Sequence, residues 1–302
     1  MGIPPPPESP PPTTVPRSGL SRRLWATIVA AVLVVIVLIG IIGYAVDGLA
    51  YAATRISSAD KTLNTVVSHQ NELNATFKDI DTRFSALGTS STFSPQQARS
   101  LVDQFVSSAQ AAGKTVEDDD ASLASAAAHL SEQPWLTTVS RGNLDKESKR
   151  IAHARKALVS AKTVAADYVL DGQFMQAFLD TVIDLDSLSK ASGRGDLATA
   201  KTTLTAMKAH VDKALQLSTA PGLPAELQSM MVDFQTLVSD FGKLIDAAEA
   251  NDSAAVSAYF KSVSDDANKL SGYSFDNMSA KINAFYKPLI DAYNLEMAAA
   301  TL

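Results

Sequence analysis

Cysteine is absent from this chain of 302 residues. Without a thiol the protein can form no disulfide, no thiolate metal site and no cysteine nucleophile, and it offers no cysteine for the acyl anchor of a lipoprotein. A chain without cysteine suits reducing and oxidising compartments equally. This absence therefore excludes several kinds of chemistry but does not assign a location.

Aromatic residues are scarce, at 7% of the sequence, although 46% of the residues are hydrophobic. β-Sheets are enriched in aromatic and β-branched residues, whereas an alanine-rich chain favours helices packed through small side chains. We therefore predict an all-α fold.

Positive charge is also in deficit. The net charge is −6, and beyond residue 46 the 23 basic residues are outnumbered by 31 acidic ones, which gives −8 for that part. A protein that binds nucleic acid needs a positive surface facing the phosphates. We expect no nucleic-acid partner.

One long segment lacks charge altogether. Residues 24–46, from Leu24 to Val46, contain no Asp, Glu, Lys or Arg and are apolar almost throughout. As a helix this segment would measure about 34 Å, enough to cross a hydrocarbon core of about 30 Å. Trp25 and Tyr44 lie near its ends, where interfacial aromatic residues belong. We predict a single transmembrane signal anchor in the lipid bilayer.

The residues on either side of this segment predict its orientation. Arg17, Arg22 and Arg23 precede it, and after it no basic residue occurs until Arg55. The positive-inside rule then places residues 1–23 in the cytoplasm and the rest of the chain outside the plasma membrane. Eight of the thirteen prolines lie in this short tail, which predicts an extended, disordered segment.

A cleavable signal peptide is the alternative to an anchor. Ala50-Tyr51-Ala52 has the small-x-small pattern that precedes cleavage, so the chain could be cut after Ala52. The apolar run is much longer than the roughly 7–15 residues of a signal-peptide core. Its length favours the uncleaved anchor.

After the anchor, apolar residues recur with alternating three- and four-residue spacing, the pattern of a helix that buries one face against another helix. The pattern predicts a long juxtamembrane helical hairpin over residues 47–133, with its turn at residues 88–93. The first helix of this hairpin could pair with the second or with another copy of the chain, so a homo-oligomer is also open. The repeating positions are Leu49, Ala52, Ile56, Ala59, Leu63, Val66, Gln70, Leu73, Phe77, Ile80, Phe84 and Leu87.

Residues 143–302 are predicted to form a bundle of shorter helices, within which the sequence repeats. A shift of 56 positions aligns residues 168–222 with residues 224–276, and each unit predicts two helices joined by a turn with an Asp cap, Asp196 or Asp252. Similar composition alone could align such helices, which is the alternative to a duplication. Matched pairs include Met175 with Met231, Phe178 with Phe234, Val182 with Val238, and Leu204 with Phe260.

Two His-x-x-Glu pairs have the spacing of metal ligands on one helix face: His69 with Glu72, and His129 with Glu132. A hairpin folded near position 91 would set His69 opposite position 113 and leave the pairs about 24 Å apart. They cannot share one ion, and each alone supplies only two ligands. We interpret all four as surface residues.

Other candidates are weaker. Residues Asp118 to Asp120 lack the Gly and the final Glu of a calcium-binding loop. His153 and His210 have no partner pattern in the sequence. We therefore predict no catalytic, cofactor-binding or metal-binding residues, and a metal-dependent activity through the His-x-x-Glu pairs is the least favoured function.

Together these features predict a membrane-anchored, extracytoplasmic helical protein. The leading hypothesis for its function is non-enzymatic: binding or scaffolding of a partner protein in the cell envelope. The alternative is a ligand sensor or solute-binding domain, with its ligand in the groove between the two helical hairpins.

Overall fold

A computed structural model describes residues 58–89, 94–131 and 137–302. The predicted tail, the anchor residues Leu24, Trp25, Tyr44 and Val46, the arginines Arg17, Arg22 and Arg23, and the cleavage position after Ala52 all lie outside this part of the chain. Among the described residues, no helix is long and apolar enough to cross a membrane. The prediction of an all-α fold is confirmed, because this part of the chain contains helices and no strand.

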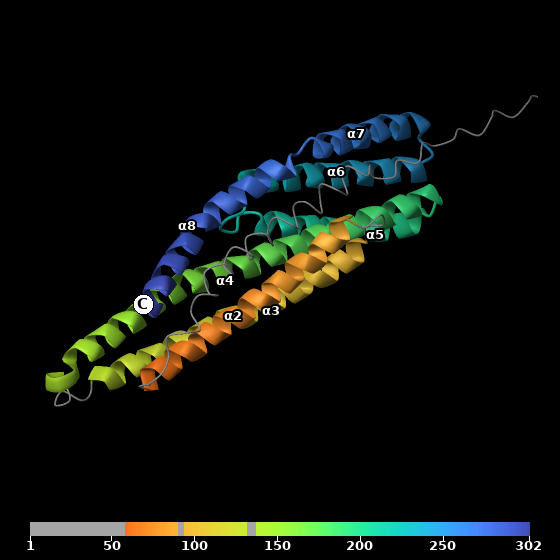
Figure 1. Cartoon of the computed structure of the whole chain (residues 1–302). Coiled ribbons are helices and arrows are strands. Elements are labelled where there is room, and N and C mark those ends of the chain that lie inside the picture. Colours follow the sequence, from red (N-terminus) through yellow and green to blue (C-terminus); the bar gives the residue numbers. More distant parts are fainter. Residues whose placement is uncertain (1–57, 90–93, 132–136) are drawn as a thin grey trace, which may run out of the picture.

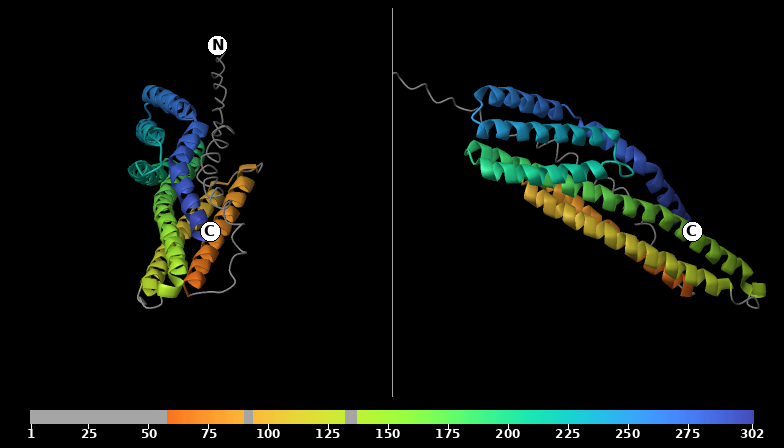
Figure 2. Two further views of the ribbon diagram at one scale, coloured as in Figure 1. Left: turned by 60° about the vertical axis from the view of Figure 1, so that its left-hand side comes forward. Right: turned by 180° about the vertical axis from the view of Figure 1, so that it is seen from behind.

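The described helices form a row in which each packs against the next, from α2 to α7, and α8 then returns along α4 (Figure 1). Figure 2 shows the same arrangement from two further sides. The helices are α2 (Ser58–Thr89), α3 (Pro95–Ser131), α4 (Thr137–Gly193), α5 (Leu197–Leu217), α6 (Ala225–Glu249), α7 (Ser253–Ser271) and α8 (Phe275–Thr301).

Helices α2 and α3 lie antiparallel, with the repeating apolar positions of α2 turned inward. Arg83 donates to Gln104 near the turn, and His69 lies beside Asp119 further along. The described part of α2 thus buries its apolar face within its own chain. Its buried positions are Ala59, Leu63, Val66, Gln70, Phe77 and Ile80.

Helix α4 differs from the prediction of shorter helices after residue 143. It runs unbroken for 57 residues, through the start of the predicted repeat at residue 168. Gly172 does not interrupt it, because the glycine serves close packing: a Cβ atom there would collide with Val106 of α3. One long helix therefore connects the hairpin to the rest of the bundle.

The turns at Asp196 and Asp252 have the same geometry, 56 residues apart. Both aspartates cap the following helix through their side chains, which accept backbone N–H groups of that helix's first turn. The residue before each cap has positive φ, 71° at Gly195 and 54° at Asn251. The duplication stays a prediction. A duplicated helical hairpin would be expected to have two turns of matching geometry, as these are.

The core has two parts. The larger cluster of buried apolar residues draws on every described helix. The smaller cluster is built mainly from small and medium side chains of α2, α3, α4 and α8, including Leu63, Leu123, Ala154 and Met297. The boundary between the two clusters contains the cavity described below.

Candidate functional site

A cavity lies between the two clusters, where α2 and α8 face each other. Helix α2 packs on α3 and α8 packs on α4, but α2 and α8 make far less backbone contact with each other. The space available to the centre of a water molecule is about 50 Å³. We call it the seam cavity; its walls include Leu73, Phe77, Val164, Tyr168, Ile290 and Tyr293.

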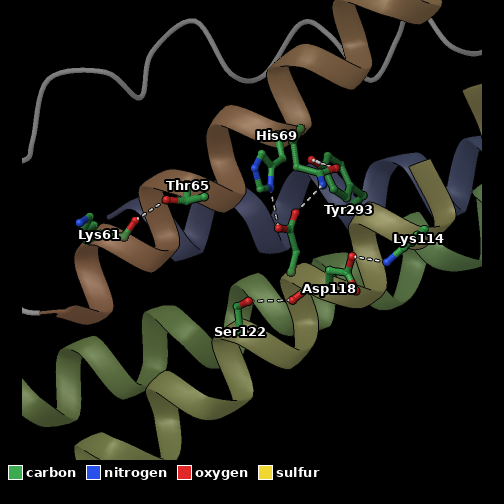
Figure 3. A network of polar contacts seen from close by, with 9 residues as sticks. Lys61, Thr65, His69, Lys114, Asp118, Ser122 and Tyr293 are labelled. Carbon is green, nitrogen blue, oxygen red and sulfur yellow. Dashed lines mark hydrogen bonds and ion pairs between the residues drawn. The ribbon is translucent and has the colours of Figure 1, made fainter. Parts of the chain in front are cut away.

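A network of polar side chains joins α2, α3 and α8 (Figure 3). Two of its members, Gln70 and Tyr293, also line the seam cavity. Nδ1 of His69 lies 2.7 Å from Oδ1 of Asp119. The Gln70 amide donates to Oδ2 of Asp119 over 3.4 Å and accepts from the Tyr293 hydroxyl over 3.3 Å. Burial raises the pKa of Asp119, and the hydrogen bond from His69 opposes this rise. The network therefore holds a buried carboxyl between α2, α3 and α8.

The three consecutive aspartates of α3 point to different partners. Asp118 pairs with Lys114, whereas Asp120 accepts from Arg155 of α4. Of the three, Asp119 contacts α2, through His69 and Gln70. Among the described residues, no group of three His, Cys, Asp or Glu side chains could hold a metal ion.

The hairpin register differs from the predicted one. His69 lies opposite position 119 rather than 113, because α2 and α3 pair around position 94, where the turn meets the start of α3. His69 is also not a simple surface residue, since its partner is the buried Asp119. Glu132, the second residue of the other His-x-x-Glu pair, lies outside the described residues.

The two histidines without a sequence pattern do have partners. His153 of α4 lies 2.5 Å from Glu296 of α8, and His210 of α5 lies 2.7 Å from Asp184 of α4. The first pair joins α4 to α8, 143 residues further along the chain, and the second joins α4 to the next helix, α5. Spacing along the chain could not have identified them, because each partner belongs to another helix.

A second buried polar group lies deeper in the bundle, next to the seam cavity. Asp171 of α4 is fully buried, and Tyr286 of α8 donates to its Oδ2 over 2.8 Å. The same hydroxyl lies 3.3 Å from the Pro221 carbonyl oxygen in the loop before α6. Burial raises the pKa of Asp171 to about 8, and the hydrogen bond from Tyr286 opposes this rise. Sequence reasoning missed this carboxyl, because a single Asp in a helical segment is usually solvated.

The groove predicted between the two hairpins lies between α5 and α6. It measures about 530 Å³ and is bordered by Leu204 and Lys208 on α5 and Val238 on α6. Gln235 donates to Asp212 over 2.6 Å across it. The two hairpins are thus held together by polar contacts as well as by apolar packing.

Comparison with known proteins adds no relative to this description: no protein family, no curated protein and no solved structure matches the chain.

Proposed function

We propose that this is a single-pass protein of the plasma membrane that binds a partner protein of the cell envelope without catalysing a reaction. In this proposal, residues 24–46 form the anchor and residues 1–23 lie in the cytoplasm. The helical bundle, with its duplicated hairpin, then lies outside the membrane. The uncharged length of the anchor segment and the arginines before it support this topology.

The outer face of α7 supports partner binding. In the predicted duplication Phe260 of α7 corresponds to Leu204 of α5. Leu204 is partly buried, and it lies over Gly242 of α6, where an added Cβ would be 3.5 Å from its side chain. No further hairpin among the described residues covers Phe260, which is 51% exposed. The same position is thus covered in the first unit and uncovered in the second.

The covered unit indicates what kind of partner would fit. Helix α6 presents Gly242, Val238 and Ser239 beside Leu204 of α5, so one large apolar side chain lies over a glycine. A terminal unit of a helical array normally ends in a polar face. Around Phe260 the side chains on the exposed face of α7 are polar and small. Such a surface suits a partner helix with a glycine or alanine opposite the Phe260 ring.

The topology can be tested because the natural chain has no cysteine. Single variants Thr14→Cys in the tail and Ser257→Cys on the exposed face of α7 would each carry one thiol. In intact cells, a membrane-impermeant maleimide should label S257C alone, and T14C should react only after lysis. Labelling of T14C in intact cells would contradict the orientation, and release of S257C into the medium without the tail would indicate cleavage.

The partner surface can be tested with a photoreactive amino acid in place of Phe260. Irradiation of intact cells should give one adduct, in which the crosslinked peptide is a helix of another envelope protein. Leu295 of α8, which is 72% exposed, is the matched control and should give no such adduct. Equal adducts at both positions, no adduct at Phe260, or an adduct of two copies of this chain would each contradict the proposal.

A further inference from the structure

Helix α8 has two apolar faces, of which the bundle buries only one. On the buried face, Tyr286, Tyr293 and Met297 are at most 3% exposed. On the opposite face, six apolar positions recur with alternating three- and four-residue spacing, which places them along one line of the helix. We call these positions the outer stripe: Phe285, Pro288, Ala292, Leu295, Ala299 and Leu302.

The outer stripe is exposed as a group. Six large hydrophobic side chains are exposed among the described residues, and three of them belong to the stripe: Phe285 at 45%, Leu295 at 72% and Leu302 at 85%. The other positions of the stripe are exposed or half-buried. Single exposed hydrophobic residues are ordinary, whereas a contiguous row of them marks a contact surface. No described helix covers this row, so what it contacts lies outside the described residues.

The outer stripe runs toward the end of the bundle at which α2 begins. Arg150 of α4 donates to Asp60, near the start of α2, over 2.7 Å, and to the Ala300 carbonyl oxygen, near the end of α8, over 2.9 Å. Figure 1 shows α7 at the other end of the bundle. In the proposed topology, only residues 47–57 separate the anchor from Ser58, and these eleven residues span at most about 40 Å. The stripe is therefore held within reach of the bilayer.

The size of the outer stripe favours lipid over a second copy of the chain. Its three large side chains expose on the order of 400 Å² of apolar surface, about half of the roughly 800 Å² that each partner buries in a standard interface. Its other positions are proline and alanine, whereas a coiled-coil seam is built from Leu, Ile and Val. A contact with the bilayer can be weaker, because the anchor already holds the chain there and the second contact is intramolecular.

The charges of α8 indicate which part of the lipid it contacts. Lys281 pairs with Glu226 of α6, and Lys287 pairs with Asp291 of α8 itself. Helices that bind anionic lipids carry basic side chains that reach the headgroups. Both lysines of α8 are paired with carboxylates, so the outer stripe offers an apolar surface without a basic patch.

We propose that the outer stripe of α8 lies on the outer leaflet of the plasma membrane, with Phe285 and Leu295 among the lipid chains. This inference rests on the proposed topology and adds a second membrane contact to the anchor. It uses a different helix from the partner surface on α7. Because the contact is apolar, neutral phosphatidylcholine is sufficient for it.

The absence of cysteine allows one fluorescent NBD group to be placed in the stripe. Ala292→Cys would carry it on the stripe, and Ser257→Cys on the exposed face of α7 is the control. Both full chains are placed in phosphatidylcholine nanodiscs with or without brominated lipid chains, which quench NBD by contact. The apolar face of an interfacial helix lies about 5–10 Å deep, so bromine should quench about half of the Ala292→Cys signal and almost none at Ser257→Cys. About 1 M salt should leave this quenching unchanged, because salt screens only charges.

Two further substitutions in the Ala292→Cys chain test the role of the large side chains. Leu295→Ser should reduce the quenching about threefold, because it removes much of the apolar area of the stripe. Val232→Ser on α6 removes an apolar side chain that is 46% exposed and should leave the quenching unchanged. Both positions are on the surface, and thermal unfolding checks that both variants fold.

The anchor and the stripe can fail separately. Alkaline washing of cell membranes tests the anchor alone: a chain that is washed off overturns the proposed topology and this contact with it. Equal quenching of Ala292→Cys and Ser257→Cys in a chain that stays in the membrane overturns the contact alone. Crosslinking of two copies through the cysteine at position 292, without quenching by lipid, would assign the stripe to a second copy and also overturn the contact.

Discussion

The hydroxyl of Tyr286 lies 2.8 Å from Oδ2 of Asp171 and 3.3 Å from the carbonyl oxygen of Pro221. A phenol has one hydrogen to donate, so it can satisfy only one of these two acceptors at a time. When Asp171 is protonated, its own hydrogen can go to the Tyr286 oxygen, and Tyr286 can then donate to Pro221. Protonation of Asp171 thus completes the hydrogen bonding that joins α4, α8 and the loop before α6.

This arrangement predicts that the protein loses stability as the pH rises. The pKa of Asp171 is about 8 in the folded protein, above its ordinary value near 4, because the carboxyl is buried. Between roughly pH 4 and pH 8 the folded state therefore binds more protons than the unfolded state, and the free energy of unfolding falls with increasing pH. Asp171→Asn should remove this dependence and become more stable than the natural chain above pH 8, by on the order of a few kcal/mol. Urea unfolding from pH 5 to pH 9 measures it, and parallel curves for the two proteins would contradict the prediction.

Removal of the Tyr286 hydroxyl should destabilise the fold at every pH. In Tyr286→Phe the buried Asp171 loses its hydrogen-bond partner, and when Asp171 is protonated the Pro221 carbonyl loses one as well, which costs about 1–3 kcal/mol. Tyr259→Phe, on the half-buried side of α7, is a matched loss of one hydroxyl and should cost less than about 0.5 kcal/mol. Chemical denaturation of both variants at pH 7 gives the comparison. Similar losses of stability in the two variants would show that the hydrogen bonds of Tyr286 do not contribute more to stability than an ordinary hydroxyl group does.

Gly222 should not tolerate a side chain, because an added Cβ would collide with a neighbour. Gly195 also has positive φ but has no such neighbour. Gly222 has φ of 86°, and an added Cβ would lie 2.7 Å from the Tyr286 hydroxyl. Gly195 has φ of 71°, but no atom lies within 4 Å of such a Cβ. Gly222→Ala should therefore lower the free energy of unfolding by about 2–4 kcal/mol, from backbone strain and collision together. Gly195→Ala should lower it by only about 1 kcal/mol, from backbone strain alone.

A third variant links this experiment to the sequence repeat. Gly195→Asn should be nearly neutral, because Asn251 adopts the corresponding conformation in the second turn, with φ of 54°. Thermal unfolding of all three glycine variants measures the order of their stabilities, with Gly195→Asn expected to be the most stable and Gly222→Ala the least. A large loss in Gly195→Asn would count against equivalence of the two turns.

Local patterns of the sequence predict the helices well, because a buried helix face depends on spacing along one segment. Leu63, Val66 and Phe77 recur at that spacing, and the structure buries all three. The turn at Asp196 was likewise predicted from its Asp cap, which the structure shows. Each of these features depends on neighbours within a few residues.

What the sequence did not reveal depends on contacts between distant segments. The register of α2 against α3 is fixed by side-chain packing between the two helices, so His69 meets Asp119 and not position 113. Asp171 has no local mark either, because its burial is produced by α8 returning along α4. The seam cavity is missed for the same reason, since its walls come from four helices.

The His69–Asp119 pair gives the last prediction, which also tests the His-x-x-Glu interpretation. In His69→Ala the buried Asp119 keeps only the 3.4 Å contact from Gln70, and the loss should be about 1–3 kcal/mol at pH 7. Burial already raises the pKa of Asp119, and loss of His69 would raise it further. The folded variant then retains its proton to higher pH, so its stability should fall more steeply than that of the natural chain as pH rises.

Glu72→Ala is the control: Glu72 is exposed, and its replacement should change stability by less than about 0.5 kcal/mol. If His69 and Glu72 instead acted as a pair, their variants would lose stability together, and added Zn²⁺ would stabilise only the natural chain.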